Sequence, residues 1–316
     1  MKCKRVFVTG GEGLVGGHVV EKLLDNENVV IVGQRSRDPR AYFFNEKLDD
    51  RAVMVHYDLK DYKRVFDIIS KYEIEVVIHL GAQPIVATAY RNPYETIESN
   101  VMGTVNVLEA CRLYGGVEAI VVASSDKAYG SSEVLPYTED MKLNGQHPYD
   151  CSKSCTDLVS KMYAETYDLP ITVSRFGNIF GPGDLNFNRI IPGIMESLIR
   201  GKELLLRSDG TLVREYLYVK DVAEGYILLA DNIEKTRGEA FNFGTSKHYS
   251  VLELIALCEE VLGKKVNYRI VNNAKGEISA QYLDSSKLKS VLDWECNGDL
   301  RDALKETYQW YNKYFV

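Results

Sequence analysis

Short apolar runs alternate with longer segments of helical period in the first half of the chain. The runs are rich in β-branched residues and lie at 5–9, 29–33, 52–57, 75–80, 118–123 and 171–176. Segments in which apolar residues recur every three or four positions lie near 13–25, 61–71, 94–114 and 148–168. Runs that are apolar on both faces and separated by helices are typical of a parallel sheet with helices on each side. The pattern therefore predicts an α/β fold built on a doubly wound parallel sheet.

Gly and Pro residues break this rhythm from about residue 177, in the stretch NIFGPGD. A helix is predicted near 190–200, and residues 204–219 are expected to form a hairpin around Asp209 and Gly210, a dipeptide suited to the positive φ of a tight turn. Further elements are predicted as helices at 221–233 and 250–262, a strand at 240–244 and two short helices before the C-terminus.

The two halves of the chain are not separated by a Ser/Gly-rich linker. We therefore expect an interleaved arrangement rather than two domains strung one after the other. The first domain is predicted to span residues 1–176, with returning segments near 219–245. The second, a smaller α+β domain that binds the substrate, is predicted to span residues 177–316.

Composition and charge exclude several classes of protein. The chain has 316 residues, of which 45% are hydrophobic and 26% charged, as in ordinary globular proteins. A formal charge of −7 argues against a nucleic-acid surface, although it leaves room for a local basic pocket for a phosphorylated small molecule. The six cysteines form no CxxC pair, so neither a metal site nor a disulfide framework is expected.

The N-terminal residues run directly into a strand-like segment instead of the apolar core of a secretory signal. No stretch approaches the roughly 20 apolar residues that a membrane-spanning helix needs. We therefore expect a cytoplasmic protein with no membrane partner.

A glycine-rich loop follows the first predicted strand. Gly10, Gly13 and Gly16 have a GxxGxxG spacing, and the loop opens the first helix. A tight turn there lets the backbone approach a diphosphate, and the helix N-terminus, including Leu14 and Val15, offers unpaired N–H groups. A plain strand-to-helix turn is the alternative. The position after a first strand favours a dinucleotide site and a Rossmann-type sheet.

The end of the second strand bears on the choice of dinucleotide. An acid there usually binds the ribose 2′-hydroxyl of NAD, but this chain has Arg35, Ser36 and Arg37. Two guanidinium groups and a hydroxyl suit a 2′-phosphate, so NADP is favoured, with NAD as the alternative. Asp58 and Leu59, after the third strand, are placed where the adenine would lie and fit either cofactor.

Tyr149 and Lys153 are four residues apart at the start of a predicted helix and share one face of it. A cation beside a phenol favours the phenolate, so we expect Lys153 to lower the pKa of Tyr149 and make it a base for an alcohol proton. A YxxxK spacing is common by chance, and a surface pair is the alternative. Ser125, a hydroxyl after the fifth strand, adds weight to the catalytic interpretation.

Together these features resemble the extended short-chain dehydrogenase/reductase family of NAD(P)-dependent nucleotide-sugar epimerases and dehydratases. The resemblance runs through nearly the whole chain, in the motifs TGGEGLVGG, HLGAQP, NVMGTVNVLEA, SSDKAYG, PYDCSK, RFGNIFGPGD, REYLYVKDVA and FNFG. It implies a Rossmann domain, a smaller nucleotide-sugar domain and commonly a homodimer through two helices, here 94–114 and 148–168.

The same resemblance implies roles for individual residues. Tyr149 is the base at the sugar 4-hydroxyl, Lys153 activates it and binds the nicotinamide ribose, and Ser125 hydrogen-bonds the 4-oxygen. Further cofactor contacts are implied for Leu80, Ala82 and Asn100, and a substrate contact for Gln83.

Asp126 and Lys127 bear on the reaction step after oxidation at C4. In this family, 4-epimerases usually carry small or uncharged residues at these positions, whereas 4,6-dehydratases carry Asp followed by Glu or Lys. The Asp-Lys form most resembles CDP-glucose 4,6-dehydratase and its relatives. Elimination of water needs an acid at O6 and a base at C5, which we assign to protonated Asp126 and neutral Lys127. The alternative is a pair that merely anchors the strand end in a 4-epimerase.

The substrate side is predicted from residues that suit a diphosphate. An arginine fork matches phosphate oxygens, and two asparagines lie in motifs of the family. The candidates are Arg189, Arg207, Arg214, Asn178 and Asn242. The family places a diphosphate-binding arginine at the position of Arg214.

The nucleotide base is predicted from the stretch AKGE at 274–277. Thymidine-type dehydratases usually have an Arg two residues before the glycine and a His after it, and Ala274 and Glu277 differ from that pattern. Glu277 could accept from an amino group of cytosine or guanine, so a CDP-hexose is preferred, with GDP- and UDP-sugars open. A non-catalytic dinucleotide sensor is a further alternative, against which the Ser125, Tyr149 and Lys153 set argues.

Overall fold

The centre of the protein is a seven-stranded parallel sheet. The structure is a computed structural model that describes residues 1–273, 278–296 and 298–316. The strand order is β11-β6-β5-β4-β1-β2-β3, and all six pairs are parallel. The strands are β1 (Arg5–Thr9), β2 (Val29–Gln34), β3 (Val53–His56), β4 (Val76–His79), β5 (Ala119–Ala123), β6 (Ile171–Phe176) and β11 (Ala240–Phe243). Every residue of β4 and β6 is buried, as expected for strands covered on both faces. The predicted Rossmann-type α/β class is confirmed.

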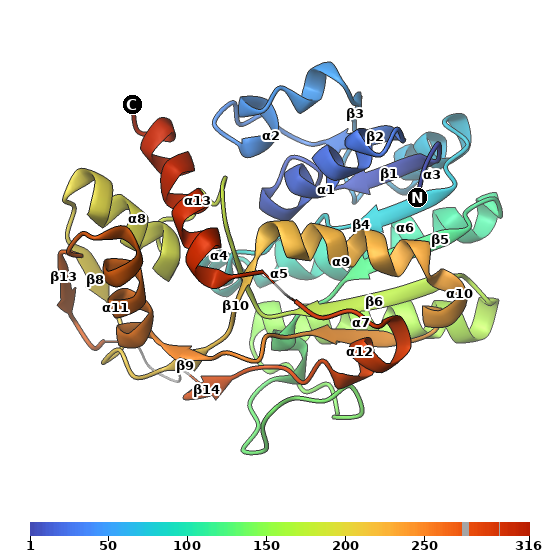
Figure 1. Ribbon diagram of the computed structural model, residues 1–316. Coiled ribbons are helices and arrows are strands. Elements are labelled where there is room, and N and C mark those ends of the chain that lie inside the picture. Colours follow the sequence, from blue (N-terminus) through green and yellow to red (C-terminus); the bar gives the residue numbers. More distant parts are fainter. Residues whose placement is uncertain (274–277, 297) are drawn as a thin grey trace.

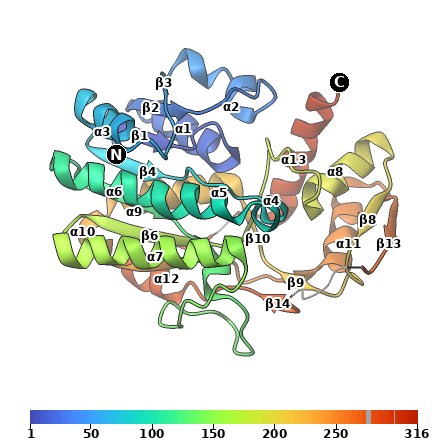
Figure 2. The ribbon, with the colours of Figure 1, turned by 180° about the vertical axis from the view of Figure 1, so that it is seen from behind.

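Helices cover both faces of the sheet. α1 (Leu14–Asp25) and α9 (Val219–Asp231) pack side by side on one face (Figure 1). α3 (Tyr62–Lys71), α6 (Gly103–Tyr114) and α7 (Pro148–Tyr167) cover the other (Figure 2). Each layer encloses its own hydrophobic core. The parallel arrangement brings the carboxyl ends of β1, β2, β4 and β5 to one edge, where such sheets bind ligands.

The second half of the chain builds a smaller part beside the sheet (Figure 1). Its elements are β7 (Asn178–Phe180), α8 (Ile190–Arg200), β8 (Leu204–Leu206), β9 (Val213–Arg214), β10 (Tyr216–Tyr218), β12 (Tyr249–Ser250), α11 (Val251–Leu262), β13 (Tyr268–Ile270), β14 (Ala280–Gln281) and α13 (Leu300–Tyr314). α8, α11 and α13 enclose a third core around Ile194, Leu254 and Leu304. α9, β11 and α12 (Ser286–Leu292) return to the sheet, so the chain crosses between the two parts more than once. The limits 1–176 and 177–316 stay a prediction.

The remaining short elements lie between these. They are α2 (Tyr42–Asn45), α4 (Val86–Arg91), α5 (Pro93–Ile97) and α10 (Ile233–Thr236), with 3₁₀ turns at Leu48–Asp50 and Asp126–Tyr129. The single helix predicted at 94–114 is α5 and α6 joined by a π-helical turn at Glu98–Met102. No helix in the described part of the chain is long and apolar enough to cross a membrane.

The predicted hairpin around Asp209 and Gly210 is wrong. Gly210 has the expected positive φ of 90°, but the strands on its two sides do not pair with each other. β8 pairs in parallel with β13, whereas β9 pairs with β12 and β14. Strands of two and three residues gain too little from a local turn to fix their partners, and packing with distant segments decides instead. The last helix, α13, has 15 residues and is longer than predicted.

Candidate active site

The glycine-rich loop fits a dinucleotide diphosphate. Gly10 has a positive φ of 68°, and a Cβ there would meet the backbone of Gly81 at 2.9 Å. A Cβ on Gly16 would lie 2.1 Å from the carbonyl oxygen of Gly10. The first helix begins after Gly13 with no side-chain cap, so its first N–H groups, including those of Leu14 and Val15, face outward unpaired by the helix. A turn of this shape lets a diphosphate approach the backbone, and the role of the loop as a cofactor site stays a prediction.

The end of β2 presents the predicted ribose-side residues, but not all of them are free to bind. Arg37 donates to Asp49 at 3.1 Å and lies over the ring of Phe44 at 4.5 Å. Arg35 and Ser36 are exposed. Sequence reasoning missed Glu12, the polar residue within the glycine loop, which accepts from the Gln34 side chain at 2.6 Å. Burial raises the pKa of Glu12, while Gln34 and Arg37 lower it.

The other predicted cofactor residues line the carboxyl edge of the sheet. Leu80 donates its N–H to the carbonyl of Thr9 at 3.2 Å, and Ala82 follows two residues later. Asn100 is buried and joins this loop to α7, since it accepts from the N–H of Gln83 at 2.7 Å and donates to Ser152 at 2.9 Å. Its side chain therefore braces the loop.

Asp58 and Leu59 follow β3 at the same edge of the sheet. Asp58 accepts from the N–H of Lys60 at 2.9 Å. Leu59 packs where a Cβ on Gly81 or Gly103 would collide with or crowd it. Leu59 thus contacts the loop at Gly81 that lies against Gly10, and the adenine contact of both residues stays a prediction.

His79 is a buried residue of this edge that sequence reasoning passed over. Its Nδ1 lies 2.8 Å from the hydroxyl of Thr9 and its Nε2 lies 3.0 Å from that of Thr104. Burial, helped by the charge of Lys153, lowers the pKa of His79 to about 3. The neutral ring thus ties β1, β4 and α6 together beneath the site.

Ser125, Asp126 and Lys127 form one hydrogen-bonded group at the end of β5. Ser125 caps the 3₁₀ turn, accepts from the N–H of Lys127 at 3.2 Å and donates to Asp126 Oδ1 at 2.9 Å. Lys127 Nζ lies 3.1 Å from Asp126 Oδ2. Asp126 is only 2% exposed, whereas the side chain of Lys127 is 25% exposed, so the acid of the pair is buried and the amine is partly open to solvent. Lys127 Nζ also donates to the side chain of Gln281 from β14.

Tyr149 and Lys153 approach the same group from α7. Pro148 opens this helix, which suits the first helical position, and the two side chains follow one turn apart. The pKa of Tyr149 is raised by burial and by the charge of Asp126, while Ser125 lowers it. This direction is opposite to the lowering expected from the sequence. Lys153 donates to the carbonyl of Ala123 at 2.7 Å, and burial lowers its pKa to about 8.

The predicted arginines of the substrate side have different surroundings. Arg189 donates to Asp184 at 2.8 Å and to the carbonyl of Ile179 at 2.7 Å. Arg214 donates to the carbonyls of Val213 and Ile278, both at 2.7 Å. Arg207 is exposed and makes no hydrogen bond or ion pair with another residue that the structure describes.

The predicted amides of the substrate side are engaged with protein atoms. Asn178 donates to the carbonyl of Glu215 at 3.3 Å. Asn242 is fully buried, accepts from the hydroxyl of Tyr129 at 2.7 Å and donates to the carbonyl of Tyr137 at 3.0 Å. Gln83 donates to Thr96 at 3.0 Å. Glu277 lies outside the described residues.

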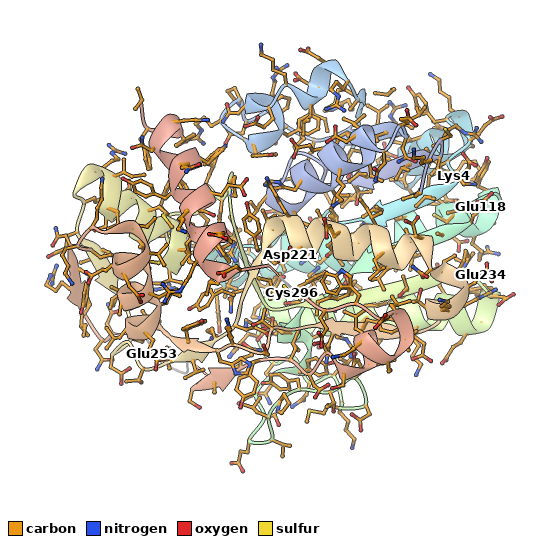
Figure 3. All side chains as sticks on the ribbon, viewed as in Figure 1. Lys4, Glu118, Asp221, Glu234, Glu253 and Cys296 are labelled. Atoms are coloured by element: carbon orange, nitrogen blue, oxygen red, sulfur yellow. The ribbon has the colours of Figure 1, made fainter. Side chains whose placement is uncertain are left out.

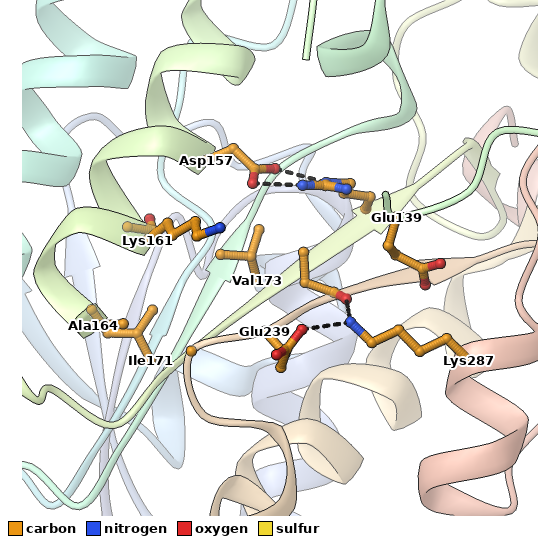
Figure 4. A pocket seen from close by; sticks show the side chains of 12 residues that line it. Glu139, Asp157, Lys161, Ala164, Ile171, Val173, Glu239 and Lys287 are labelled. Carbon is orange, nitrogen blue, oxygen red and sulfur yellow. Dashed lines mark hydrogen bonds and ion pairs between the residues drawn. The ribbon is translucent and has the colours of Figure 1, made fainter. Parts of the chain in front are cut away.

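The Asn242 contact belongs to a buried network that holds the 3₁₀ turn of the site. Arg175 makes a two-point ion pair with Asp157, with both distances 2.8 Å, and donates to the hydroxyl of Tyr129 at 2.6 Å. Arg175 and Asp157 line a cavity of about 110 Å³ between α7 and the edge of the sheet (Figure 4). None of the predicted site residues lines this cavity, so it is separate from the catalytic group.

The cysteines form no disulfide in the described structure, and burial keeps some of their thiols protonated. All six are free, and burial raises the pKa of Cys258 and of Cys296 to about 12. Cys296 donates to Asp221 at 3.3 Å, beside the start of α9 (Figure 3). Within the described ranges, no cluster of three or more His, Cys, Asp or Glu side chains could hold a metal ion.

Sequence comparisons show which known proteins the chain resembles. The model of the "NAD dependent epimerase/dehydratase family" matches residues 6–244. The UDP-glucose 4-epimerase of Bacillus subtilis is 29% identical, with 96% of each chain covered. The CDP-glucose 4,6-dehydratase of Salmonella typhimurium is also 29% identical, with 98% of this chain and 90% of that protein covered.

Solved structures agree over the whole length. The UDP-glucose 4-epimerase of Thermotoga maritima with UDP-glucose has a TM-score of 0.90 at 31% identity, covering 99% of this chain and all of that one. The dTDP-glucose 4,6-dehydratase of Streptomyces venezuelae with NAD and TYD bound has a TM-score of 0.88 at 28% identity, covering 98% and 97%. The similar proteins thus include both epimerases and dehydratases.

Proposed function

The chain belongs to the NAD-dependent epimerase/dehydratase family, and from this premise we propose that it is a nucleotide-sugar 4,6-dehydratase. Its substrate is a nucleoside-diphosphate hexose, with a CDP-glucose-like sugar preferred, and its product is the 4-keto-6-deoxy sugar nucleotide. The observation that carries the proposal is the Asp126–Lys127 pair, in which a buried acid contacts a partly buried amine and is hydrogen-bonded to Ser125. A 4-epimerase removes neither the C5 proton nor O6, so its reaction does not require an acid and a base at this position.

Oxidation at C4 is the first step. Tyr149 takes the proton of the 4-hydroxyl, Ser125 hydrogen-bonds the 4-oxygen, and Lys153 stabilises the phenolate. A dinucleotide held by the glycine loop and Lys153 would supply the hydride acceptor for C4 and the hydride donor for C6. Burial and the charge of Asp126 raise the pKa of the Tyr149 phenol, so a cation such as Lys153 would have to offset both for Tyr149 to act as the base.

Loss of water is the second step. The Asp126–Lys127 pair shares one proton in either of two forms, the ion pair or the neutral acid and amine. A proton shift across the 3.1 Å contact gives the acid for O6 and the base for C5–H without exchange with solvent. Once Asp126 has protonated O6 and Lys127 has taken the C5 proton, the ion pair is restored. The ammonium of Lys127 exchanges with solvent and then returns a proton to C5 as the hydride reaches C6. The proton that Tyr149 takes from O4 balances the one that Asp126 gives to the departing water.

Incubation in heavy water tests the proposal. The protein is given CDP-, GDP-, UDP- and dTDP-hexoses, and products are analysed by mass spectrometry and NMR. We expect a product that has lost O6 as water and carries deuterium at C5. Products that keep O6 and gain no deuterium at C5 with all four nucleotides would contradict it.

A 4-epimerase is the second candidate, because the Bacillus subtilis 4-epimerase matches the chain at the same 29% identity as the Salmonella dehydratase. Asp126 and Lys127 would then be bystanders, and the 4-keto sugar would be reduced on its other face. The same heavy-water experiment identifies this outcome by an intact hexose of inverted C4 configuration.

Between NADP and NAD, we propose that NADP is the cofactor and that Arg35 and Ser36 bind its 2′-phosphate. Replacing Arg35 by alanine should weaken NADP binding roughly tenfold, the value of one charge-assisted hydrogen bond, and leave NAD binding unchanged. Calorimetric titration with each dinucleotide measures this. Arg51→Ala, an exposed arginine paired with Asp25, is the control. Tighter binding of NAD than of NADP by the parent protein would overturn the choice.

A homodimer is proposed through α4 to α7. On one face α4, α5 and α6 follow one another alongside α7 (Figure 2). These helices and the π-helical turn carry exposed apolar residues, namely Val86, Tyr90, Tyr94, Ile97, Met102, Leu113, Leu158, Met162 and Tyr167. An apolar face of this extent typically marks an interface. The partner is a second copy of the chain, whose two long helices complete a four-helix bundle.

Replacing both Leu158 and Met162 by aspartate should convert this dimer to a monomer, since a twofold contact places four new charges in one interface. Light scattering after size-exclusion chromatography reports the mass. Leu205→Asp, at an exposed residue of β8, is the matched control and should leave the dimer intact. A monomeric parent protein would contradict the proposal.

A further inference from the structure

Gln281 connects the second half of the chain to the catalytic pair. It belongs to β14, 154 residues after Lys127, and is 1% exposed. Its Oε1 accepts from Lys127 Nζ, and its Nε2 donates to the backbone carbonyl of Asp126 at 3.4 Å. Because the carbonyl of Asp126 needs a donor, the amide is oriented with its oxygen toward Lys127.

The backbone of Gln281 is held on both sides. Gln281 pairs with Arg214 of β9 in the short sheet of the second half. The next residues pair with the loop that follows the 3₁₀ turn, where the N–H of Tyr137 donates to the carbonyl of Tyr282 at 3.0 Å and that of Asp284 to Tyr137 at 2.8 Å. The amide therefore approaches Lys127 from a fixed position and not from a mobile tail.

Three acids among the described residues interact with the charge of Lys127. Asp126 contacts it at 3.1 Å. Asp150 on α7 and Glu215, between β9 and β10, are buried, and the charge of Lys127 lowers the pKa of each against the rise caused by burial. Carboxylates favour the ammonium form of a lysine. An amide oxygen accepts from an ammonium group and from a neutral amine alike, so Gln281 fixes the position of Nζ while leaving its proton free to move.

We propose that Gln281 is a positioning residue that holds Lys127 for proton transfer at C5. The inference rests on the proposed dehydratase activity and makes β14 part of the elimination step. C4 oxidation, which depends on Tyr149 and Lys153, does not need it. The second half of the chain thereby contributes to catalysis as well as to substrate binding.

Two substitutions separate this role from a merely structural one. Gln281→Glu adds a carboxylate beside Lys127, which favours the ammonium form, so the rate of C5 exchange in heavy water should fall about tenfold. The alkaline side of the pH–rate profile, where the Asp126–Lys127 pair loses its shared proton, should move up by roughly one pH unit. Gln281→Met removes the oxygen that accepts from Lys127 Nζ. The rate of C5 exchange should fall by a similar factor, while the alkaline side of its pH–rate profile should move down. In both variants, C4 oxidation, followed as reduced nicotinamide absorbance in a single turnover, should keep its rate and its pH profile.

The control is Asn28→Leu, which removes a buried amide bonded to the backbone at the far end of β2. It should lower the free energy of unfolding and leave the pH–rate profiles of C4 oxidation and of C5 exchange unchanged. An unshifted pH–rate profile of C5 exchange in both Gln281 variants, or an equal loss of C4 oxidation and C5 exchange, would overturn the role of Gln281. Absence of C5 exchange in the parent protein would instead overturn the dehydratase itself, so the two failures are distinguishable.

Discussion

Replacing Tyr149 by phenylalanine should lower turnover about a thousandfold, the typical contribution of a general base, while nucleotide-sugar binding stays unchanged. The phenol is the group that faces Ser125 and Asp126 from α7, and phenylalanine keeps its ring but cannot take a proton. Steady-state assays give the loss in turnover. Calorimetric titration with the nucleotide sugar verifies that the ring still packs as before.

The matched control is Tyr163→Phe on the same helix. Its hydroxyl donates to Glu109 at 3.1 Å, away from the catalytic group, and its loss should leave turnover within about twofold. Unchanged turnover in Tyr149→Phe would exclude the proposed base. No turnover by the parent protein on any nucleotide sugar would favour the dinucleotide sensor instead.

Replacing Lys127 by methionine should strongly slow dehydration and retain C4 oxidation. Without the amine, C5–H has no base, and the loss should reach roughly a hundredfold to ten-thousandfold in product formation. Reduced nicotinamide should accumulate with the 4-keto hexose, because Ser125, Tyr149 and Lys153 are unaltered. Absorbance in single turnover and deuterium content at C5 measure the two steps separately.

The substitution leaves Asp126 buried without its cation, which destabilises the fold by an amount of its own. Asp126→Asn is therefore the second variant. It keeps the shape and the hydrogen bond with Ser125 but cannot protonate O6, and it should show the same split between the two steps. Lys161→Met, at an exposed lysine of α7, is the control. Full turnover in both site variants would make the pair a bystander and favour the epimerase.

Local patterns predicted the frame of the site well. The strands at 5–9 and 171–176 have the limits expected, and Gly10 lies in the tight turn expected after the first strand, with a φ of 68°. Period, β-branched content and glycine spacing act over a few residues, so they can be interpreted without knowing the fold. The one-turn spacing of Tyr149 and Lys153 is predictable for the same reason.

Contacts between distant segments were not predictable in this way. Arg37 was expected to be free for a phosphate, yet Asp49 and Phe44 engage it. Asn242 was assigned to the substrate, yet it joins Tyr129 to Tyr137 in the interior. Each of these outcomes depends on which segments pack together.

The sequence by itself determined the Rossmann-type sheet, the tight glycine turn after its first strand and the one-turn spacing of Tyr149 and Lys153, because each depends on residues close together in the chain. The tertiary structure decided the partners of β8 and β9, the raised pKa of Tyr149 and the environment of Lys127. Burial and charge depend on groups brought from far along the chain, such as Gln281. The sequence thus suggests which residues to propose as acid and base, and only the folded protein shows which groups surround them.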